Sequence, residues 1–319
     1  MVAGSSTGAG GTAQTRGRPE AIFIVGVSRS GTTLLRRILE TSPEIAIATE
    51  NHFLGHVLPH EGARYYFRRL GDLGDDAVVH RLVGYVYSGE FQRRSRWREV
   101  SPYWRWLTRE VTPAEFEHAL LAGERSERGL FIALMRVYAD HLGRPVMGEK
   151  TPAHLAYVDT LLDWFPHARV VHMLRDPRAV YVSELQRRRG KPRRPYSWLM
   201  KAPLAFQAVL LWQTTWAWAD AARRHSRLVR RYPDRYRLVR FEDLVTDPDD
   251  TVPALFGFLG VPLPDNATEV KVVSRGFRWH EQGLDAAAAT RWREHIHPFA
   301  ERWLRLWLRG PMKRLGYER

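Results

Sequence analysis

The chain has 319 residues, 44% hydrophobic and 26% charged, so it can bury the core of one large α/β domain or two small ones. This composition excludes a disordered, collagen-like or coiled-coil protein, and the lack of cysteine excludes disulfides, thiolate catalysis and cysteine-ligated metal sites. The net charge is +14, because forty-four arginines and five lysines outnumber 35 acidic residues. Arginine binds planar anions through a fixed fork of donors, so the charge favours an anionic partner, although an arginine-rich genome would produce the same count.

The beginning of the chain, residues 1–19, is small and polar and lacks the apolar core of a signal peptide, so we expect a disordered leader. The longest apolar stretch, residues 202–222, is interrupted by polar side chains and falls short of a membrane span. We expect it to form a buried amphipathic helix in which Trp212 and Trp216, four residues apart, are buried together. These features indicate a cytoplasmic protein without a membrane span.

Five short apolar runs, rich in β-branched residues, predict buried parallel strands. They are Ala21–Gly26, Glu44–Ala48, Arg144–Gly148, Ala168–Leu174 and Arg235–Arg240. Helical patterns alternate with these runs and cover Thr32–Thr41, Pro113–His141, Ala153–Phe165, Pro177–Arg189, Leu204–Arg231 and Thr251–Leu259. The alternation predicts an α/β fold, with an open, mostly parallel sheet of about five strands and helices on both faces.

Residues 20–319 are expected to form a single domain with two irregular segments. Residues 52–143, between the second and third strands, form a helical insertion rich in Trp, Tyr and Arg. Residues 187–203 form a basic loop interrupted by prolines. Each segment would either cap a site at the edge of the sheet or decorate the surface.

The segment 26–33, GVSRSGTT, follows the first strand directly and leads into a helix. A glycine-bounded turn at this place directs backbone N–H groups and a helix N-terminus at one point, which favours anion binding. The spacing matches the phosphate loop G-x-x-x-x-G-K-[ST], except that Thr32 replaces the lysine while Arg29 supplies a cation. The missing lysine, together with cationic ends on the third and fourth strands, disfavours a Mg²⁺-dependent kinase or triphosphatase. An ordinary glycine turn that caps a helix is the simpler alternative.

Four segments together resemble the sulfotransferases that use 3′-phosphoadenosine 5′-phosphosulfate (PAPS): the loop VGVSRSGTTLL, Glu50, EKTP at 149–152 and LRDPRAVYVS at 174–183. The likeness runs from about Ile22 to Tyr317 and is greatest to the branch that contains tyrosylprotein sulfotransferases and many bacterial small-molecule or carbohydrate sulfotransferases. It implies a P-loop-type sheet, PAPS as cosubstrate, 3′,5′-phosphoadenosine (PAP) as product, and no metal.

The resemblance implies roles for single residues around the donor. Five loop residues correspond to those that hold the 5′-phosphosulfate, namely Arg29, Ser30, Gly31, Thr32 and Thr33. Arg175 and Ser183 match the pair that binds the 3′-phosphate, and Arg187 matches a further cofactor contact. Arg291 and Trp292 occupy the place of a basic residue and a tryptophan that close over the nucleotide, after a contact loop at Ser274–His280.

At the reacting end, the resemblance places Glu50 at the position of the catalytic base and Lys150 at that of the catalytic lysine. Lys150 and Arg29 would stabilise the negative charge that develops on the leaving phosphate. Two departures stand out. Phe241 replaces a tyrosine, which keeps stacking but loses one hydrogen bond, and Thr49-Glu50-Asn51 replaces a more charged run, which disfavours a tyrosine-peptide acceptor.

The order of the elements supports these roles independently, because ligands of open parallel sheets bind at the carboxyl ends of the strands. Five different strand ends deliver the nominated residues: Arg29, Glu50, Lys150, Arg175 and Phe241. We therefore expect these side chains to surround one small polyanion, which assigns part of the charge to a nucleotide cosubstrate and not to DNA or a membrane.

Several assignments keep alternatives. His52 is a rival base to Glu50, because the pKa of an imidazole suits proton transfer near neutral pH. Lys150 would otherwise form a simple ion pair with Glu149. The thirteen histidines lack metal-ligand spacing, and the basic run Arg187–Arg194 lacks a recognised nucleic-acid motif.

The sequence therefore predicts an enzyme that transfers a sulfuryl group to a hydroxyl or amine of a small molecule, carbohydrate or lipid. An ATP-dependent phosphotransferase and a non-catalytic nucleotide- or polyanion-binding module are the alternatives.

Overall fold

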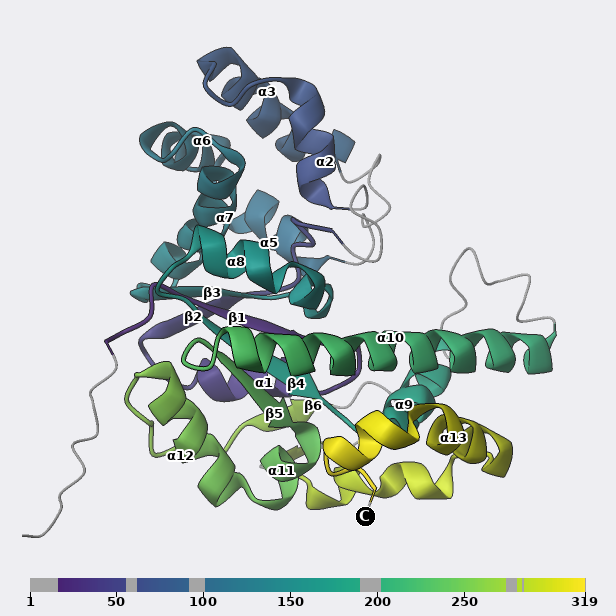
Figure 1. The fold of residues 1–319 in the computed structure, drawn as a ribbon. Coiled ribbons are helices and arrows are strands. Elements are labelled where there is room, and N and C mark those ends of the chain that lie inside the picture. Colours follow the sequence, from purple (N-terminus) through teal and green to yellow (C-terminus); the bar gives the residue numbers. More distant parts are fainter. Residues whose placement is uncertain are drawn as a thin grey trace, which may run out of the picture.

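The computed structural model describes residues 17–55, 62–91, 101–189, 202–273, 280–282 and 284–318 (Figure 1). Three of the predicted segments therefore lie largely outside the described residues. These are the leader 1–19, the basic loop 187–203 and the contact loop Ser274–His280.

The centre of the molecule is a five-stranded sheet with the order β2-β3-β1-β4-β5, in which every neighbouring pair is parallel. Its strands are β1 (Ala21–Gly26), β2 (Ile45–Ala48), β3 (Val146–Lys150), β4 (Arg169–Leu174) and β5 (Tyr236–Arg240). The predicted fold class is thus confirmed. The third strand differs from the expected range: it begins two residues later and ends at Lys150, so that Lys150 lies opposite Ile24 of β1.

Both faces of the sheet are covered by helices, because alternate residues of the strands belong to two separate cores. Phe23 and Val25 of β1 face a large core with α7 (Glu127–His141), α8 (Val158–Trp164), α9 (Pro177–Arg189) and α10 (Pro203–Arg231). Ile22 and Ile24 face a smaller core with α1 (Thr32–Leu39), α11 (Phe241–Thr246) and α12 (Pro248–Leu259). The chain therefore leaves β1 on one face and β4 on the other. The carboxyl ends of these two neighbours are thus the switch point at which open parallel sheets bind ligands.

The insertion between β2 and β3 is helical, as expected, and α7 packs on β2 and β3. It contains α2 (Ala63–Phe67), η2 (Arg68–Leu70), α3 (Asp76–Tyr87), α5 (Pro102–Glu110), α6 (Pro113–Ala122) and α7, which rise above the sheet in Figure 1. The single helix expected over Pro113–His141 is wrong. The helix stops at Gly123, and a new one starts where the Ser126 side chain accepts a hydrogen bond from the Gly129 N–H. After β3, a 3₁₀ turn, η3 (Pro152–Tyr157), precedes α8.

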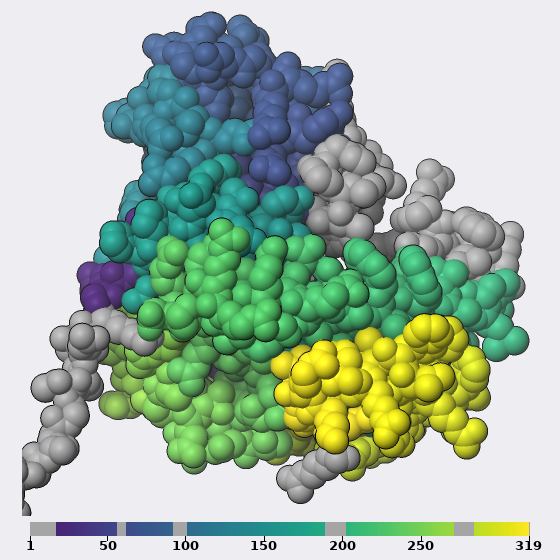
Figure 2. Space-filling model, viewed as in Figure 1, coloured from purple at the N-terminus to yellow at the C-terminus, as the bar shows by residue number. Residues whose placement is uncertain are grey.

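The C-terminal part of the chain contains the hairpin of β6 (Lys271–Val273) and β7 (His280–Gln282), the short helices η5 (Ala286–Ala289) and η6 (Arg291–Glu294), and α13 (Pro298–Arg314). Of these elements, α13 packs on α9 and α10, η6 packs on α9, and η5 packs on α11. In Figure 2, α13 and α10 form neighbouring ridges of one surface. Within the described ranges, no helix is both long enough and apolar enough to cross a bilayer.

The expectation that Trp212 and Trp216 are buried together is wrong. They are 61% and 50% exposed, respectively. The buried face of α10 instead carries Phe206, Leu210 and Trp218. A spacing of four residues places two side chains on the same helix face, but it does not say whether that face meets the core.

Candidate active site

The loop between β1 and α1 depends on left-handed backbone conformations, with φ angles of 149° at Gly26, 73° at Arg29 and 91° at Gly31. A Cβ atom at Gly26 would overlap the Met173 carbonyl oxygen of β4, and one at Gly31 would overlap the Phe241 ring. Glycine is therefore required at both ends of the loop by conformation and by space. Among the described residues, no side chain caps α1, so its first N–H groups and the positive end of its dipole remain available to an anion.

An arginine cluster, which we define as Arg29, Arg175, Ser183 and Phe241, surrounds this loop. The Arg29 Nε donates to the Ser183 hydroxyl of α9 at 3.0 Å. The Arg175 guanidinium donates to the Arg29 carbonyl at 3.5 Å and to the Ala288 carbonyl at 2.8 Å. The same guanidinium lies 4.1 Å from the centre of the Phe241 ring. The structure thus brings together four residues that the sequence nominated from three separate segments.

Arg175 carries unsatisfied hydrogen-bonding capacity. Among the described residues, its Nε atom is buried without a hydrogen-bond partner, and so is the Ser30 hydroxyl of the loop. Within the part of the chain that the structure describes, no carboxylate forms an ion pair with Arg175. Burial lowers the pKa of Arg175 to about 10, against the opposing field of Glu242. A buried donor without a partner costs about 1–3 kcal/mol, so these atoms are well suited to receive an anion.

A second group of charges, which we call the carboxylate cluster, consists of Glu50, His52 and Lys150. The Lys150 ammonium donates to Glu50 Oε1 at 2.5 Å, and His52 Nε2 lies 3.6 Å from Glu50 Oε2. Lys150 therefore pairs with Glu50 and not with Glu149. Burial by itself would raise the pKa of Glu50, but the adjacent His52 imidazole and the charge of Lys150 outweigh it and lower the pKa to about 2. The two candidate bases lie side by side.

Glu149 organises the backbone beneath the carboxylate cluster, a role that the sequence did not reveal. Its carboxylate accepts hydrogen bonds from the Thr151 hydroxyl and from the Asn51 N–H (3.4 Å), and it contacts His154 Nδ1 at 3.1 Å. The His154 Nε2 accepts from the Leu54 N–H at 3.3 Å, so the ring proton resides on Nδ1 and points at Glu149. This network ties the loop after β2 to the end of β3. The EKTP segment contained the signal, since a glutamate at the end of a buried strand requires partners.

The other nominated residues have contacts of their own. Arg187 pairs with Glu184 of its own helix at 2.5 Å, and this hydrogen bond, together with the charges of Glu184 and Glu50, raises the pKa of Arg187 against the effect of burial. Arg291 pairs with Asp285 at 2.6 Å, and the Trp292 ring lies beneath the Arg178 guanidinium at 4.4 Å. Thr32 is buried at the start of α1, with Thr33 next to it.

Two further contacts around Arg175 were missed by the sequence reasoning. Glu242 accepts a hydrogen bond from the Asp176 N–H at 2.9 Å, and burial raises the pKa of this carboxyl. Trp218 of α10 donates its indole N–H to the Arg175 carbonyl at 2.8 Å. Both partners come from positions distant in sequence, and no local pattern marks them. Across the described ranges, no group of three or more His, Asp or Glu side chains is placed to hold a metal ion.

The chain is similar to known proteins in both sequence and fold. A family model described as "Sulfotransferase family" matches residues 19–265. The chain is 26% identical over 168 residues to Protein-tyrosine sulfotransferase A of Caenorhabditis elegans, which covers 52% of this chain and 33% of that protein. It is 29% identical over 175 residues to Carbohydrate sulfotransferase 5 of Mus musculus, which covers 47% of this chain and 41% of that protein. These alignments span less than half of each relative.

Among solved structures, the chain is similar to the sulfotransferase domain of the Synechococcus PCC 7002 olefin synthase. The TM-score is 0.61 at 21% identity, with 95% of this chain and 96% of that domain covered. This likeness concerns the fold.

Proposed function

The chain belongs to the sulfotransferase family, and from this premise we propose that it moves the sulfuryl group of PAPS to a hydroxyl or amine of a small-molecule, carbohydrate or lipid acceptor. One observation carries the proposal: the loop after β1, Arg175 and Ser183 form a single hydrogen-bonded cluster with unsatisfied buried donors. A site with this donor set and without a phosphate-loop lysine suits a nucleotide with two phosphate-bearing ends.

The residues fit PAPS by their chemistry. The loop N–H groups, Ser30 and Arg29 would hold the phosphosulfate end, with Thr32 and Thr33 at the start of α1. Arg175 and Ser183 would hold the 3′-phosphate, and the unpartnered Nε of Arg175 gives the guanidinium a free donor for this purpose. Arg187, Phe241 and Arg291 complete the proposed nucleotide contacts.

The proposed reaction uses the carboxylate cluster. When bound, PAPS supplies a sulfur that forms a bond to the acceptor oxygen or nitrogen while its bond to the 5′-phosphate oxygen breaks. Glu50 takes the proton of the acceptor, and Lys150 with Arg29 stabilises the charge left on the phosphate. Before the donor binds, the adjacent His52 and the charge of Lys150 together hold Glu50 ionised, with a pKa of about 2. Movement of the Lys150 ammonium toward the incoming anion raises the pKa of Glu50 and makes it a better base.

His52 is the alternative base. It is buried, has a positive φ of 52° and lies 3.6 Å from Glu50. In the main proposal His52 orients Glu50; in the alternative it takes the proton itself and Glu50 orients the imidazole. Substitution of each residue separates the two, as described below.

The acceptor side of the site is assigned to the insertion 52–143 together with the basic loop 187–203, within a single domain 20–319. Two hydrogen bonds support this role of the insertion. The Ser101 hydroxyl donates to the Glu50 carbonyl, and the Trp104 indole donates to the Asn51 carbonyl at 3.0 Å. The start of α5 therefore contacts the loop that carries the proposed base.

Thermal unfolding with added nucleotides tests the cosubstrate. We expect PAP to raise the melting temperature without Mg²⁺, and ATP to have little effect with or without Mg²⁺. Stabilisation by Mg·ATP equal to that by PAP would instead support a phosphotransferase, and no response to PAP would contradict the proposal. Transfer of labelled sulfate from PAPS to a panel of phenols, sugars, sterols and lipid alcohols then identifies the acceptor class. PAP binding without any transfer would indicate a non-catalytic module.

A further inference from the structure

Large apolar side chains are exposed on α10 and α13 in unusual number. Six of them, together called the aromatic surface, are Leu204, Trp212, Trp216, Phe299, Leu306 and Trp307. They are more than half of the large exposed hydrophobic side chains in the described ranges, and they include every exposed tryptophan of those ranges. Single exposed apolar residues are ordinary, but a concentration on two adjacent helices marks an interaction site.

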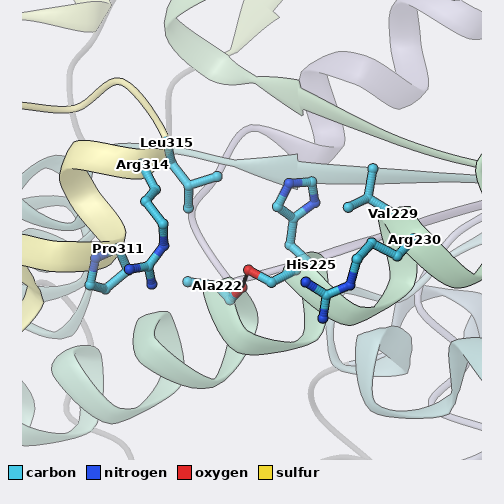
Figure 3. Close-up of a pocket in the computed structure, with 8 residues that line it drawn as sticks. Ala222, His225, Val229, Arg230, Pro311, Arg314 and Leu315 are labelled. Atoms are coloured by element: carbon cyan, nitrogen blue, oxygen red, sulfur yellow. Dashed lines mark hydrogen bonds between the residues drawn. The ribbon is translucent and has the colours of Figure 1, made fainter.

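The two helices join these residues into one surface. The Trp303 indole of α13 donates to the Thr215 hydroxyl of α10 at 3.1 Å, and Thr215 lies between Trp212 and Trp216 in sequence. The Trp303 ring also lies 6.2 Å from Phe299 and 5.4 Å from Trp307. The helices appear as adjoining ridges in Figure 2. Farther along, they flank a pocket between Ala222, His225 and Val229 of α10 and Pro311 and Arg314 of α13 (Figure 3), so they run side by side in the same direction.

Folding of α13 does not require its exposed apolar residues. Four residues at regular spacing, Ala300, Leu304, Leu308 and Met312, already anchor the helix to the core. The exposed Phe299, Leu306 and Trp307 form a second apolar set outside that face. Each buried aromatic ring removes about 150–250 Å² from water, so covering this second set would supply a large driving force for association.

The charges around the aromatic surface identify the partner. Five cations of α13 are exposed between and beside its apolar residues: Arg302, Arg305, Arg309, Lys313 and Arg314. Glu301 is the single acidic residue of this helix. A second copy of the chain docked through the same surface would bring these cations together, which opposes self-association. An anionic lipid surface satisfies both features, because tryptophan rings lie at the headgroup level and arginines bind lipid phosphates.

We propose that α10 and α13 dock the protein on an anionic lipid bilayer, with the aromatic surface in the headgroup region. This use of the exposed arginines was not foreseen from the sequence, which assigned part of the charge to a nucleotide cosubstrate and none of it to a membrane. The proposal is independent of the transfer reaction, because none of its residues belongs to the arginine or carboxylate cluster.

Docking would place the candidate active site close to the bilayer. Trp218 of α10 contacts the Arg175 carbonyl at the carboxyl edge of the sheet, and His225, seven residues later, already contacts Tyr236 at the start of β5. The N-terminal half of α10 therefore projects beyond the carboxyl edge, as Figure 1 shows. At 1.5 Å per residue, Leu204 lies about 20 Å along the helix from Trp218.

Cosedimentation of the full chain with vesicles tests the proposal. We expect binding to phosphatidylcholine vesicles that contain about a third phosphatidylserine, and binding at least about tenfold weaker to pure phosphatidylcholine vesicles or in high salt. The triple substitution Trp212→Ser, Trp216→Ser, Trp307→Ser and, separately, Arg302→Glu with Arg309→Glu should each weaken binding about tenfold or more. All of these positions are exposed, and an unchanged melting temperature verifies that each variant folds.

The matched control removes exposed apolar side chains of the insertion, by Tyr65→Ser with Leu121→Ser. This variant should bind vesicles within about twofold of the parent chain. Failure of the parent chain to bind anionic vesicles, or an equal loss in the control, would overturn the proposal. A concentration-dependent dimer that the tryptophan substitutions dissociate would overturn it in favour of a second copy. PAP binding in the same variants should be unchanged, so failure here is distinguishable from failure of the proposed function.

Discussion

The two halves of the candidate site differ in how their charges are balanced. On the side of β2 and β3, Lys150 and Glu50 neutralise each other beside His52, and Glu149 has several partners of its own. On the side of β1 and β4, Arg175 has no ion-pair partner among the described residues. Its Nε atom and the Ser30 hydroxyl of the adjacent loop are buried without a hydrogen-bond partner in the same ranges. The second half is prepared for an anion from outside the protein. The first half must exchange one of its internal partners before its carboxylate can act.

Substitution of Glu50 is the most direct test of the proposed division of roles between the two halves. We expect Glu50→Gln to lower turnover by about 10²–10⁴-fold, because the amide has no basic oxygen to take the acceptor proton. PAP affinity should stay within about threefold, since the nucleotide contacts are assigned to the other half. Initial rates at saturating PAPS and calorimetric titration with PAP measure the two quantities.

His52→Asn is the matched control for that prediction. In the main proposal it lowers turnover less than Glu50→Gln does, because the carboxylate is still present. Near-normal turnover in Glu50→Gln, combined with a large loss in His52→Asn, would transfer the role of base to His52.

The arginine half is tested by Arg175→Ala. Loss of charge-assisted hydrogen bonds to a phosphate, worth about 1.5–3 kcal/mol, should weaken PAP binding about 10–100-fold. The affinity for 5′-AMP should change much less, because it lacks the 3′-phosphate. Arg237→Ala, which removes an arginine of β5 bonded to the Ala254 carbonyl, serves as the control. Equal losses for PAP and 5′-AMP would contradict the assignment of Arg175 to the 3′-phosphate.

The pH dependence of the free energy of unfolding tests the charge balance of the carboxylate half. The folded pKa of Glu50 is about 2, below its ordinary value of 4.5. Its contribution to stability is therefore complete above about pH 4.5 and is lost as the pH falls toward 2. Glu50→Gln should lower the free energy of unfolding by about 2 kcal/mol at pH 7 and by little near pH 2.

Urea unfolding at several pH values measures this difference. Part of the loss at neutral pH arises because Lys150 stays buried without its counterion, so the double variant Glu50→Gln, Lys150→Met should recover stability. Glu117→Gln, at a carboxylate that contacts the exposed His80 side chain at 3.1 Å, is the control with little expected effect. A pH-independent loss in Glu50→Gln would show that the pair with Lys150 does not hold the carboxylate ionised.

The sequence was sufficient to predict which strand ends carry the candidate site residues. It was insufficient to predict which of these side chains pair with one another. Strand ends are readable because apolar runs and glycine turns are local signals, and these alone placed Arg29, Glu50 and Arg175 at one edge of the sheet. The partner of Lys150 was not readable, because Glu50 and Glu149 are both close once β2 and β3 pair. The exposure of Trp212 also depends on where α13 packs, which is a tertiary property that helix periodicity does not encode.

Removal of one hydrogen bond to Glu149 is the prediction with the smallest expected effect. It tests how rigid the carboxylate half of the site is. Thr151→Val removes one hydroxyl from Glu149 with almost no change of shape, while Asn51 and His154 keep their contacts. We expect a loss of about 1 kcal/mol in the free energy of unfolding, because the buried carboxylate loses one donor. Turnover should fall by less than about tenfold, with PAP affinity unchanged, since Glu149 acts on the reaction only through the backbone that bears Glu50.

Thr108→Val is the matched control for this last comparison. Among the described residues, the Thr108 hydroxyl bonds only within its own helix, to the Trp104 and Arg105 carbonyls. Its unfolding free energy should change by less than about 0.5 kcal/mol. If Thr151→Val weakened PAP binding as strongly as it slowed turnover, the two halves of the site would be mechanically coupled. The exchange of partners at Lys150 would then begin when the arginine half binds its anion, and the separation of roles between the halves would be wrong.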